Sequence, residues 1–178
     1  MLQKSTTDKI AADFFMHPNK QFYLIELSRR NKIAHTVVTT AIKMLLENKL
    51  ILQNIEKRGK RKFPIYYANL NAKEYRKEKK IYNFSLILRS GIIEFLEEQL
   101  SPKTIILFGS FQKGEDIETS DIDLFAQCSA EKIDISSFEQ KIGRKIELHF
   151  NKKFSTYPKE LKNNIANGIV LSGFLEVF

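Results

Sequence analysis

The chain has 178 residues, of which 43% are hydrophobic and 28% charged, the balance of a globular protein with one compact domain or two small ones. No apolar run approaches the roughly 20 residues that a membrane span needs, and the N-terminus has no apolar signal-peptide core. The single cysteine, Cys128, excludes an internal disulfide and a multi-cysteine zinc site. We therefore expect a cytoplasmic protein in a reducing compartment, without a membrane partner.

Charge is distributed unevenly along the chain. Residues 1–80 contain 18 Lys and Arg against 7 Asp and Glu, a net charge of +11. Residues 81–178 contain 11 Lys and Arg against 14 Asp and Glu, a net charge of −3, and the two halves together give the overall +8. A basic half joined to a mildly acidic half predicts two modules with different partners, and the basic module is the candidate for binding a polyanion.

The first part of the chain predicts three helices, at about residues 6–17, 24–31 and 35–48, because apolar residues recur there at helical spacing. Thr6 and Thr7 are favourable N-cap residues for the first helix. Pro18 ends it, since the residue before a proline disfavours the helical conformation. The residues expected to be buried are Ile10, Phe14, Phe15, Leu24, Ile25, Leu27, Val37, Val38, Ala41, Ile42, Leu45 and Leu46.

A basic hairpin is expected next. Residues 51–55 and 63–70 predict two strands, and residues 57–62, Lys-Arg-Gly-Lys-Arg-Lys, predict the turn between them. Pro64 favours a position near a sheet edge, because proline cannot donate a ladder hydrogen bond. Five cations within six residues repel one another unless solvent or a polyanion screens them.

Three helices followed by a basic hairpin resemble a winged helix-turn-helix domain, over about residues 6–70, and we assign residues 1–72 to it. In that family the third helix enters the DNA major groove, and the hairpin tip lies along the backbone or the minor groove. The alternative is a solvated basic turn or a surface that docks a protein. The nucleic-acid-binding residues that the resemblance implies are Thr36, Thr39, Thr40 and Lys43 on the helix, with Lys57, Arg58, Lys60, Arg61 and Lys62 on the hairpin.

Residues 73–100 predict a single linker helix with an apolar stripe that has to pack on something. Gly91 lies within it, and Ser101-Pro102 ends it. The helix could be a spacer, the first helix of the second domain, or the interface of a homodimer. The stripe consists of Tyr75, Tyr82, Leu86, Ile93, Leu96 and Leu100.

The second half of the chain contains two aspartates two positions apart. Residues 103–108 predict a buried strand that leads into a tight turn at Gly109-Ser110. After ten intervening residues, the sequence Asp121-Ile122-Asp123-Leu124 alternates as a strand does, which places the two carboxylates on one face. Because close carboxylates repel each other, a divalent cation is expected between them, and Mg²⁺ (or Mn²⁺) suits such an oxygen site.

The Gly-Ser turn followed by Asp-x-Asp is similar to the pattern of nucleotidyltransferases of the DNA polymerase β superfamily, and the likeness covers about residues 84–178. It implies an α/β (α+β) domain with a mixed sheet, here residues 101–178, closed by a helix and a short strand within residues 161–173. Minimal members often carry Arg in the turn after Gly-Ser, where this chain has Gln112 and Lys113. A lysine there can act as a point charge to phosphate but cannot form a bidentate fork.

The resemblance also implies the roles of individual residues. Asp121 and Asp123 would be catalytic and hold the metal ions, and Glu147 on an expected strand at residues 145–150 would supply the third carboxylate. A surface role for Glu147 is the alternative. The nucleotide-binding residues would be Gly109, Ser110, Lys113 and Ser120.

The function that the resemblance implies is metal-dependent transfer of a nucleoside monophosphate from an NTP, with ATP as the expected nucleotide, to an acceptor hydroxyl. Pyrophosphate would be released, and the acceptor could be a protein, an RNA or a small molecule. The winged helix would bind DNA or the acceptor. Two alternatives remain: a DNA-binding transcriptional regulator whose nucleotidyltransferase domain senses nucleotide or is inactive, and an antitoxin-like nucleotidyltransferase that modifies a partner protein.

Overall fold

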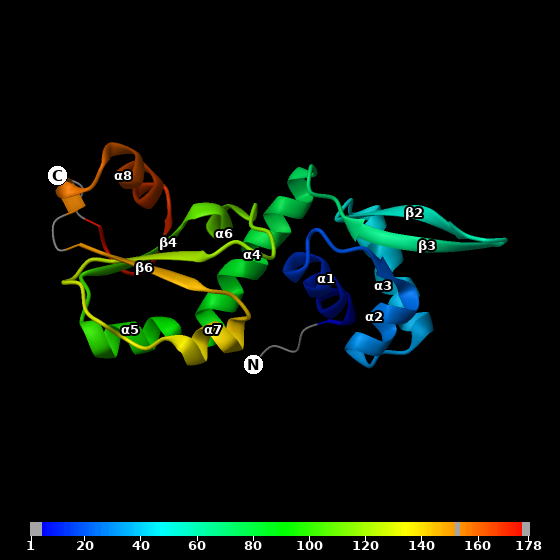
Figure 1. Cartoon of the computed structure of the whole chain (residues 1–178), viewed down its shortest axis with the longest axis horizontal. Helices are drawn as coiled ribbons and strands as arrows, with labels where there is room; N and C mark the ends of the chain where they lie inside the picture. Colours follow the sequence, from blue (N-terminus) through cyan, green and yellow to red (C-terminus); the bar gives the residue numbers. More distant parts are fainter. Residues whose placement is uncertain (1–4, 152–153, 176–178) are drawn as a thin grey trace. The chain divides into compact units, whose positions relative to one another are not determined.

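The computed structural model describes residues 5–151 and 154–175, and the chain divides into two compact units between Lys79 and Lys80. In the described residues the first unit has a three-stranded sheet and the second a four-stranded sheet (Figure 1). No helix in the described ranges has both the length and the apolar character that crossing a membrane requires.

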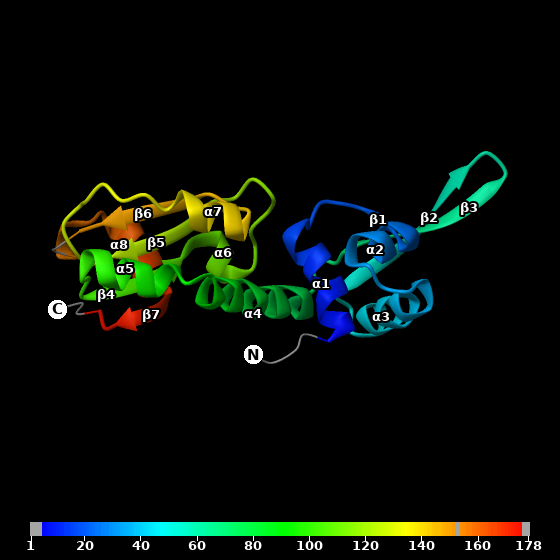
Figure 2. The same ribbon diagram turned by 90° about the horizontal axis from the view of Figure 1, so that it is seen from below.

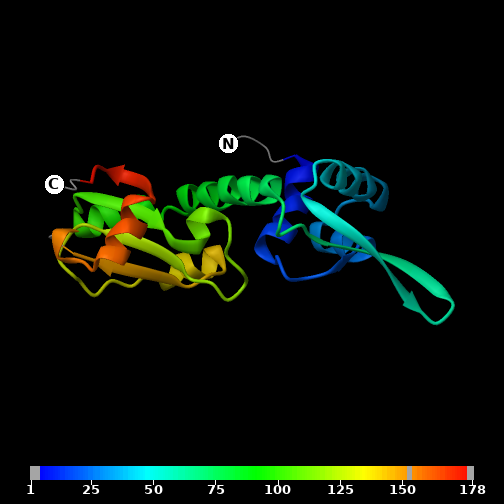
Figure 3. The same cartoon turned by 90° about the horizontal axis from the view of Figure 1, so that it is seen from above.

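The first unit contains three helices and an antiparallel sheet with strand order β1-β3-β2. The three predicted helices are confirmed. Figures 2 and 3 show the β2–β3 hairpin extending away from these helices. The elements are α1 (Thr6–Met16), β1 (Phe22–Tyr23), α2 (Leu24–Asn31), α3 (His35–Glu47), β2 (Ile51–Arg58) and β3 (Arg61–Ala68).

Three details of the predicted helices were wrong. The N-cap of α1 is Ser5, whose hydroxyl accepts the N–H of Asp8 while the Asp8 carboxylate accepts the N–H of Ser5, a reciprocal capping box. Ile25 and Val37 are 55% and 44% exposed, not buried. Only one stripe of each helix faces the core, and the fully buried neighbours Leu27 and Val38 occupy it.

The hairpin is longer than predicted, because β2 and β3 continue through most of the expected turn. Only Gly59 and Lys60 lie between the strands, and Gly59 has a φ of +59°, which suits glycine in a tight turn. Pro64 lies in β3, the central strand of the sheet, one residue beyond its pairing with β1 at Ile65. Only β2 pairs with β3 at this position, so Pro64 lies at a local edge, as predicted, where a missing N–H is tolerated.

The second unit contains a four-stranded sheet with order β6-β5-β4-β7. The β5–β6 pair is parallel, and the β4–β5 and β4–β7 pairs are antiparallel, so the predicted mixed sheet is confirmed. The elements that follow β3, of which the first includes the unit boundary, are α4 (Lys73–Ser90), α5 (Ile92–Leu100), β4 (Thr104–Phe108), α6 (Gly109–Lys113), β5 (Ile122–Ala126), α7 (Ser136–Ile142), β6 (Ile146–Phe150), η1 (Phe154–Thr156), α8 (Lys159–Ala166) and β7 (Ile169–Gly173).

The segment predicted as one linker helix is two helices. The break is at Gly91, which has a φ of +85°, a conformation that only glycine adopts at little cost. The Ser90 hydroxyl accepts the N–H of Ile92 at 3.2 Å and so supports the start of α5. Ile87 of α4, with Ile92 and Leu96 of α5, is fully buried in the core under the sheet.

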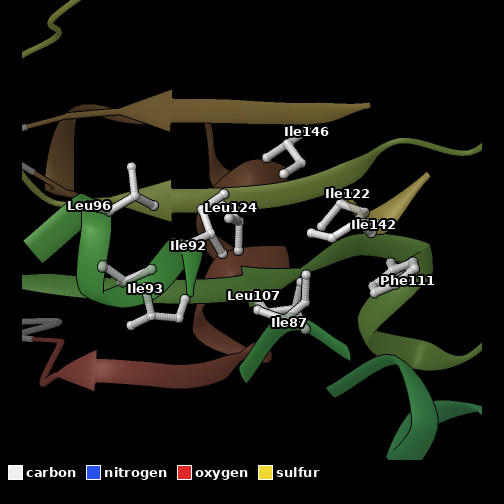
Figure 4. Close-up of a cluster of buried hydrophobic side chains, with 11 residues drawn as sticks. Ile87, Ile92, Ile93, Leu96, Leu107, Phe111, Ile122, Leu124, Ile142 and Ile146 are labelled. Atoms are coloured by element: carbon white, nitrogen blue, oxygen red, sulfur yellow. The ribbon is translucent and has the colours of Figure 1, made fainter. Parts of the chain in front are cut away.

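Alternating side chains divide between the two faces of the sheet. Figure 1 shows α5 and α7 on one side and α8 on the other. The core under α5 and α7 includes Leu107, Ile122 and Leu124 (Figure 4). Phe108 and Phe125 belong to the core on the α8 side. Burial of Ile122 and Leu124, each contributing about 1.5–3 kcal/mol, therefore fixes the residue between them, Asp123, on the α8 side.

Candidate active site

Two parallel strands bring three polar side chains together in the second unit. Asp123 of β5 and Glu147 of β6 are register partners, and His149 follows two positions along β6 on the same face. The Nε2 atom of His149 lies 3.4 Å from Asp123 Oδ1 and 3.8 Å from Glu147 Oε1. One ligand atom from each residue lies within 4.8 Å of the others.

These side chains differ in their exposure to solvent. Those of Asp123 and His149 are 25% and 21% exposed, whereas that of Glu147 is 60% exposed. The ring of Phe108 lies 5.1 Å from the imidazole of His149, centroid to centroid, and forms an apolar wall beside it. The cluster is therefore firmly placed on the Asp123 and His149 side and accessible to solvent on the Glu147 side.

The imidazole responds to the neighbouring carboxylates. The hydrogen bond with Asp123 is the largest cause that raises the pKa of His149 above its ordinary value. Burial acts in the opposite direction, and the negative charges of Glu147 and Asp123 add to the increase. The side chains thus form a negative site that attracts positive charge.

The Gly-Ser turn lies against this cluster. Phe108, the last residue of β4, pairs with Asp123, and the chain turns at Gly109 with a φ of +77° into α6. A Cβ atom at this position would collide with a carboxylate oxygen of Asp123. The structure therefore brings Gly109 and Asp123 together, and the turn requires glycine for both its backbone conformation and the close approach of the carboxylate.

A buried polar network holds the loop between α6 and β5. Asn83 of α4 donates to the Phe111 carbonyl at 2.8 Å and to Asp116 Oδ1 at 2.7 Å. The Arg144 guanidinium lies 3.5 Å from Asp116 Oδ2 and also donates to the Ile117 carbonyl. Asn83, Asp116 and Arg144 are all at least 94% buried, so this network fixes the segment that leads to Asp121.

The remaining predicted residues lie in α6 and in the segment that precedes β5. Asp121 is exposed immediately before β5 and is not one of the three clustered residues. The Ser120 hydroxyl accepts the N–H of Ile117 at 2.9 Å and so closes the turn before Asp121. Ser110 is half-buried at the start of α6, and Lys113 is exposed at its end. Their roles stay predictions.

The sequence reasoning missed His149, Asp116 and Arg144. The alternation of residues 145–150 could have identified His149, because residues two apart on a strand share a face and Glu147 was already placed there. Asp116 and Arg144 carry no such signal, since they lie in connecting segments and meet only in the tertiary structure.

The candidate nucleic-acid surface of the first unit is divided between α3 and the hairpin. Thr39 and Arg58 line one cavity of about 590 Å³, together with aromatic and apolar residues that include Tyr23, Phe63 and Pro64. The hydroxyl of Thr39 donates to the His35 carbonyl. Thr36 and Thr40 are exposed as well, and the Thr40 hydroxyl donates to the Thr36 carbonyl.

Two of the predicted cations already have acidic neighbours. Lys43 lies 3.9 Å from Glu47. Arg58 donates to Glu56 at 3.0 Å and to the Tyr23 hydroxyl at 2.6 Å, and its guanidinium lies over the Tyr23 ring. The other predicted hairpin cations, which are all exposed, are Lys57, Lys60, Arg61 and Lys62.

Comparison with known proteins relates the second unit to a family. Residues 90–173 match the family model described as "Polymerase beta, Nucleotidyltransferase". The matched segment contains the Gly109-Ser110 turn and the whole Asp123, Glu147 and His149 cluster, and it does not extend into the first unit. A nucleotidyltransferase domain is thus supported for residues 90–173.

Among solved structures, the chain is similar to a "Possible transcriptional regulator" from Methanosarcina mazei Go1. The identity is 16% and the TM-score 0.38, over 55% of this chain and 79% of that one. A likeness this distant carries no conclusion about function. No curated protein matches the chain.

Proposed function

We propose that the second unit transfers a nucleoside monophosphate from an NTP to an acceptor hydroxyl. The observation that carries the proposal is the placement of Asp123 and Glu147 side by side on β5 and β6, against the Gly109 turn, within the segment that matches the nucleotidyltransferase family model. The carboxylates and the imidazole offer oxygen and nitrogen donors within 4.8 Å, a donor set that fits a divalent cation.

The chemistry follows from charge and position. The acceptor oxygen attacks the α-phosphorus, the bond to the α–β bridging oxygen breaks, pyrophosphate leaves, and the hydroxyl proton passes to a nearby carboxylate or to water. A bound Mg²⁺ or Mn²⁺ would neutralise the phosphate charge and activate the attacking oxygen. Asp121, Asp123 and Glu147 are proposed to hold the metal. The backbone at Gly109-Ser110, with Ser120 and the Lys113 charge, is proposed to orient the triphosphate.

The first unit is proposed to act as a winged helix that binds nucleic acid. The pairing of the hairpin supports this, because Lys57 is opposite Lys62 and Arg58 is opposite Arg61. Like charges directly opposite each other destabilise a strand pair, and phosphates would relieve that repulsion while releasing counterions. The unit would then bring the transferase to DNA or to an RNA or protein acceptor.

A second candidate function follows from the same hairpin charges. A DNA-binding regulator would use the first unit as its working part, and the second unit would sense nucleotide or be inactive. An Asp121→Asn variant tests this candidate. Salt-dependent DNA affinity that Asp121→Asn leaves unchanged would favour the regulator.

The proposed nucleotide site is tested by calorimetric titration of the full chain with ATP and then GTP, with and without Mg²⁺ or Mn²⁺. The variants are Asp123→Asn and Glu147→Gln. The control is Glu98→Gln, which removes the same charge from an exposed position on α5. We expect metal-dependent binding by the wild type and the control, and its loss in both site variants with unchanged circular dichroism. Absence of wild-type binding at millimolar nucleotide would overturn the proposal.

A further inference from the structure

One member of the cluster is a nitrogen donor. His149 lies on the same face of β6 as Glu147, and its Nε2 atom lies within 4 Å of a carboxylate oxygen of Asp123 and of Glu147. A Mg²⁺ site does not require an imidazole at this position, because Mg²⁺ prefers oxygen ligands in octahedral geometry. The imidazole therefore bears on which metal the site selects.

The distances are close to those of ligands that share one ion. Donors that each lie about 2.0–2.2 Å from a metal are separated from their neighbours by about 3–3.5 Å. The separation of His149 Nε2 from Asp123, 3.4 Å, lies in this range, and its separation from Glu147, 3.8 Å, lies slightly above it. The 3.4 Å contact is a long hydrogen bond, since ordinary N–H···O bonds measure about 2.7–3.2 Å. A metal ion between the two groups would replace it.

The surroundings hold the imidazole at this place. His149 pairs with Phe125 in the parallel β5–β6 register, and its ring packs 5.1 Å from that of Phe108. Its side chain is 21% exposed, against 60% for Glu147. A ring positioned by a strand and an aromatic neighbour loses little freedom when it binds a metal, so its contribution to affinity is large for a single donor.

We propose that His149 is a metal ligand beside Asp123 and Glu147, and that the site consequently binds a divalent transition metal ion such as Mn²⁺ more tightly than Mg²⁺. This rests on the proposed function, because the same two carboxylates serve the nucleotide reaction. The physical reason is that an imidazole nitrogen adds affinity for transition metals, whereas carboxylate and water suffice for Mg²⁺.

The test uses the full chain with Mn²⁺ alone, because the nitrogens of a nucleotide would confuse the signal. The electron paramagnetic resonance signal of free Mn²⁺, followed during a titration, gives the Kd of the protein for Mn²⁺. Displacement of Mn²⁺ by added Mg²⁺ gives the Kd for Mg²⁺. Pulsed measurements detect nitrogen bonded directly to Mn²⁺. A second sample carries ¹⁵N only in histidine, so the ligand is identified without any substitution. The variant is His149→Gln, and the matched control is His35→Gln, at an exposed position on α3 of the first unit.

The expected result is a ¹⁴N coupling in the wild type that becomes a ¹⁵N coupling in the labelled protein. It persists in His35→Gln and disappears in His149→Gln. We expect the variant to bind Mn²⁺ at least about 10-fold more weakly, because losing a ligand should cost no less than losing a residue that only orients one, which costs about 10- to 100-fold, with a smaller change for Mg²⁺. Mn²⁺ bound without nitrogen coupling, or a coupling that survives His149→Gln, would overturn the inference and leave the proposed function standing. Failure to bind any divalent cation would overturn both.

Discussion

The two units differ in how closely their polar residues are tied to the buried core. In the second unit, Asp123 lies between Ile122 and Leu124, which are fully buried, and its register partner Glu147 lies on the adjoining strand. In the first unit, the hairpin cations lie beyond the core, and even apolar hairpin residues such as Ile55 are exposed, by 54% in that case. A side chain flanked by core residues is held in one position. On an exposed strand, a neighbouring cation can make the same contact with a ligand, so no single charge is essential.

The comparison predicts unequal costs for breaking an ion pair in each unit. Arg144→Met removes a partner from the buried pair with Asp116 and leaves an uncompensated carboxylate, so we expect it to destabilise the second unit by about 3–5 kcal/mol. Arg58→Met removes the exposed partner of Glu56 and should change stability little. Urea unfolding is monitored by hydrogen exchange in β3 and in β5, which reports the stability of the first and the second unit separately. Equal shifts for the two variants would show that burial does not distinguish the pairs.

Two glycines allow a finer comparison, because both have positive φ. At Gly109, a Cβ atom meets the Asp123 carboxylate, whereas at Gly59 nothing lies within 4 Å. Both Ala variants bear the left-handed backbone cost of about 1–2 kcal/mol. Only Gly109→Ala should also displace Asp123 and weaken metal-dependent nucleotide binding. The two variants are compared by thermal unfolding and calorimetric titration, and intact nucleotide binding in Gly109→Ala would contradict the close approach described.

The hairpin charges should behave additively, unlike the strand-bound cluster. Replacing Lys57, Lys60, Arg61 and Lys62 by Gln should lower the salt dependence of DNA binding by about 0.9 in the log–log slope for each phosphate that is no longer neutralised. Each single replacement should lower the slope by a part of the decrease seen in the quadruple variant. Fluorescence anisotropy across a salt series measures the slope, with Glu98→Gln as the control from the second unit. A slope that is unchanged in the quadruple variant would remove the hairpin from any nucleic-acid interface.

The smallest expected effect concerns the start of β6. The Glu139 carboxylate accepts the N–H of Ile146 at 2.9 Å and pairs with Lys145 at 3.1 Å, and the bond from Ile146 is the largest cause that lowers the pKa of Glu139 below its ordinary 4.5. A lowered folded-state pKa stabilises the protein above the unfolded-state value, and the contribution is lost as the pH falls through the folded-state value. Glu139→Gln should therefore be less stable than wild type at pH 7, and the difference should shrink below about pH 4.5. Unfolding curves from pH 7 to pH 3 check the trend, and a difference that grows on acidification would contradict it.

The sequence predicted the elements whose signals are local. The buried strand at residues 104–108, the turn at Gly109 and the alternation around Asp123 could be located because strand periodicity and glycine preference act over a few residues. The alternation of residues 145–150 predicted a strand, and the resemblance to nucleotidyltransferases implied that its Glu147 lies on the strand beside the aspartates. The three helices of the first unit followed from the spacing of their apolar residues.

What could not be predicted depends on contacts between distant segments. Nothing near Asp116 in the sequence indicates its bond with Asn83, 33 positions earlier. The exposure of Ile25 and Val37 depends on which stripe of each helix the rest of the unit covers. The length of the hairpin was underestimated because runs of charge are typical of turns, while here they continue a strand pair up to Arg58 and Arg61.

If the β5–β6 carboxylates support nucleotidyl transfer, ATP labelled at either the α- or the γ-phosphate will reveal it. Wild type, Asp123→Asn and Glu98→Gln are incubated with Mn²⁺ and a lysate as the source of acceptors. We expect the α-label to enter the acceptor and the γ-label to leave as pyrophosphate. Asp123→Asn should lower the rate about a thousandfold, since each 1.4 kcal/mol of lost transition-state stabilisation costs about tenfold. Transfer of the γ-label, or equal incorporation by wild type and Asp123→Asn, would contradict the account.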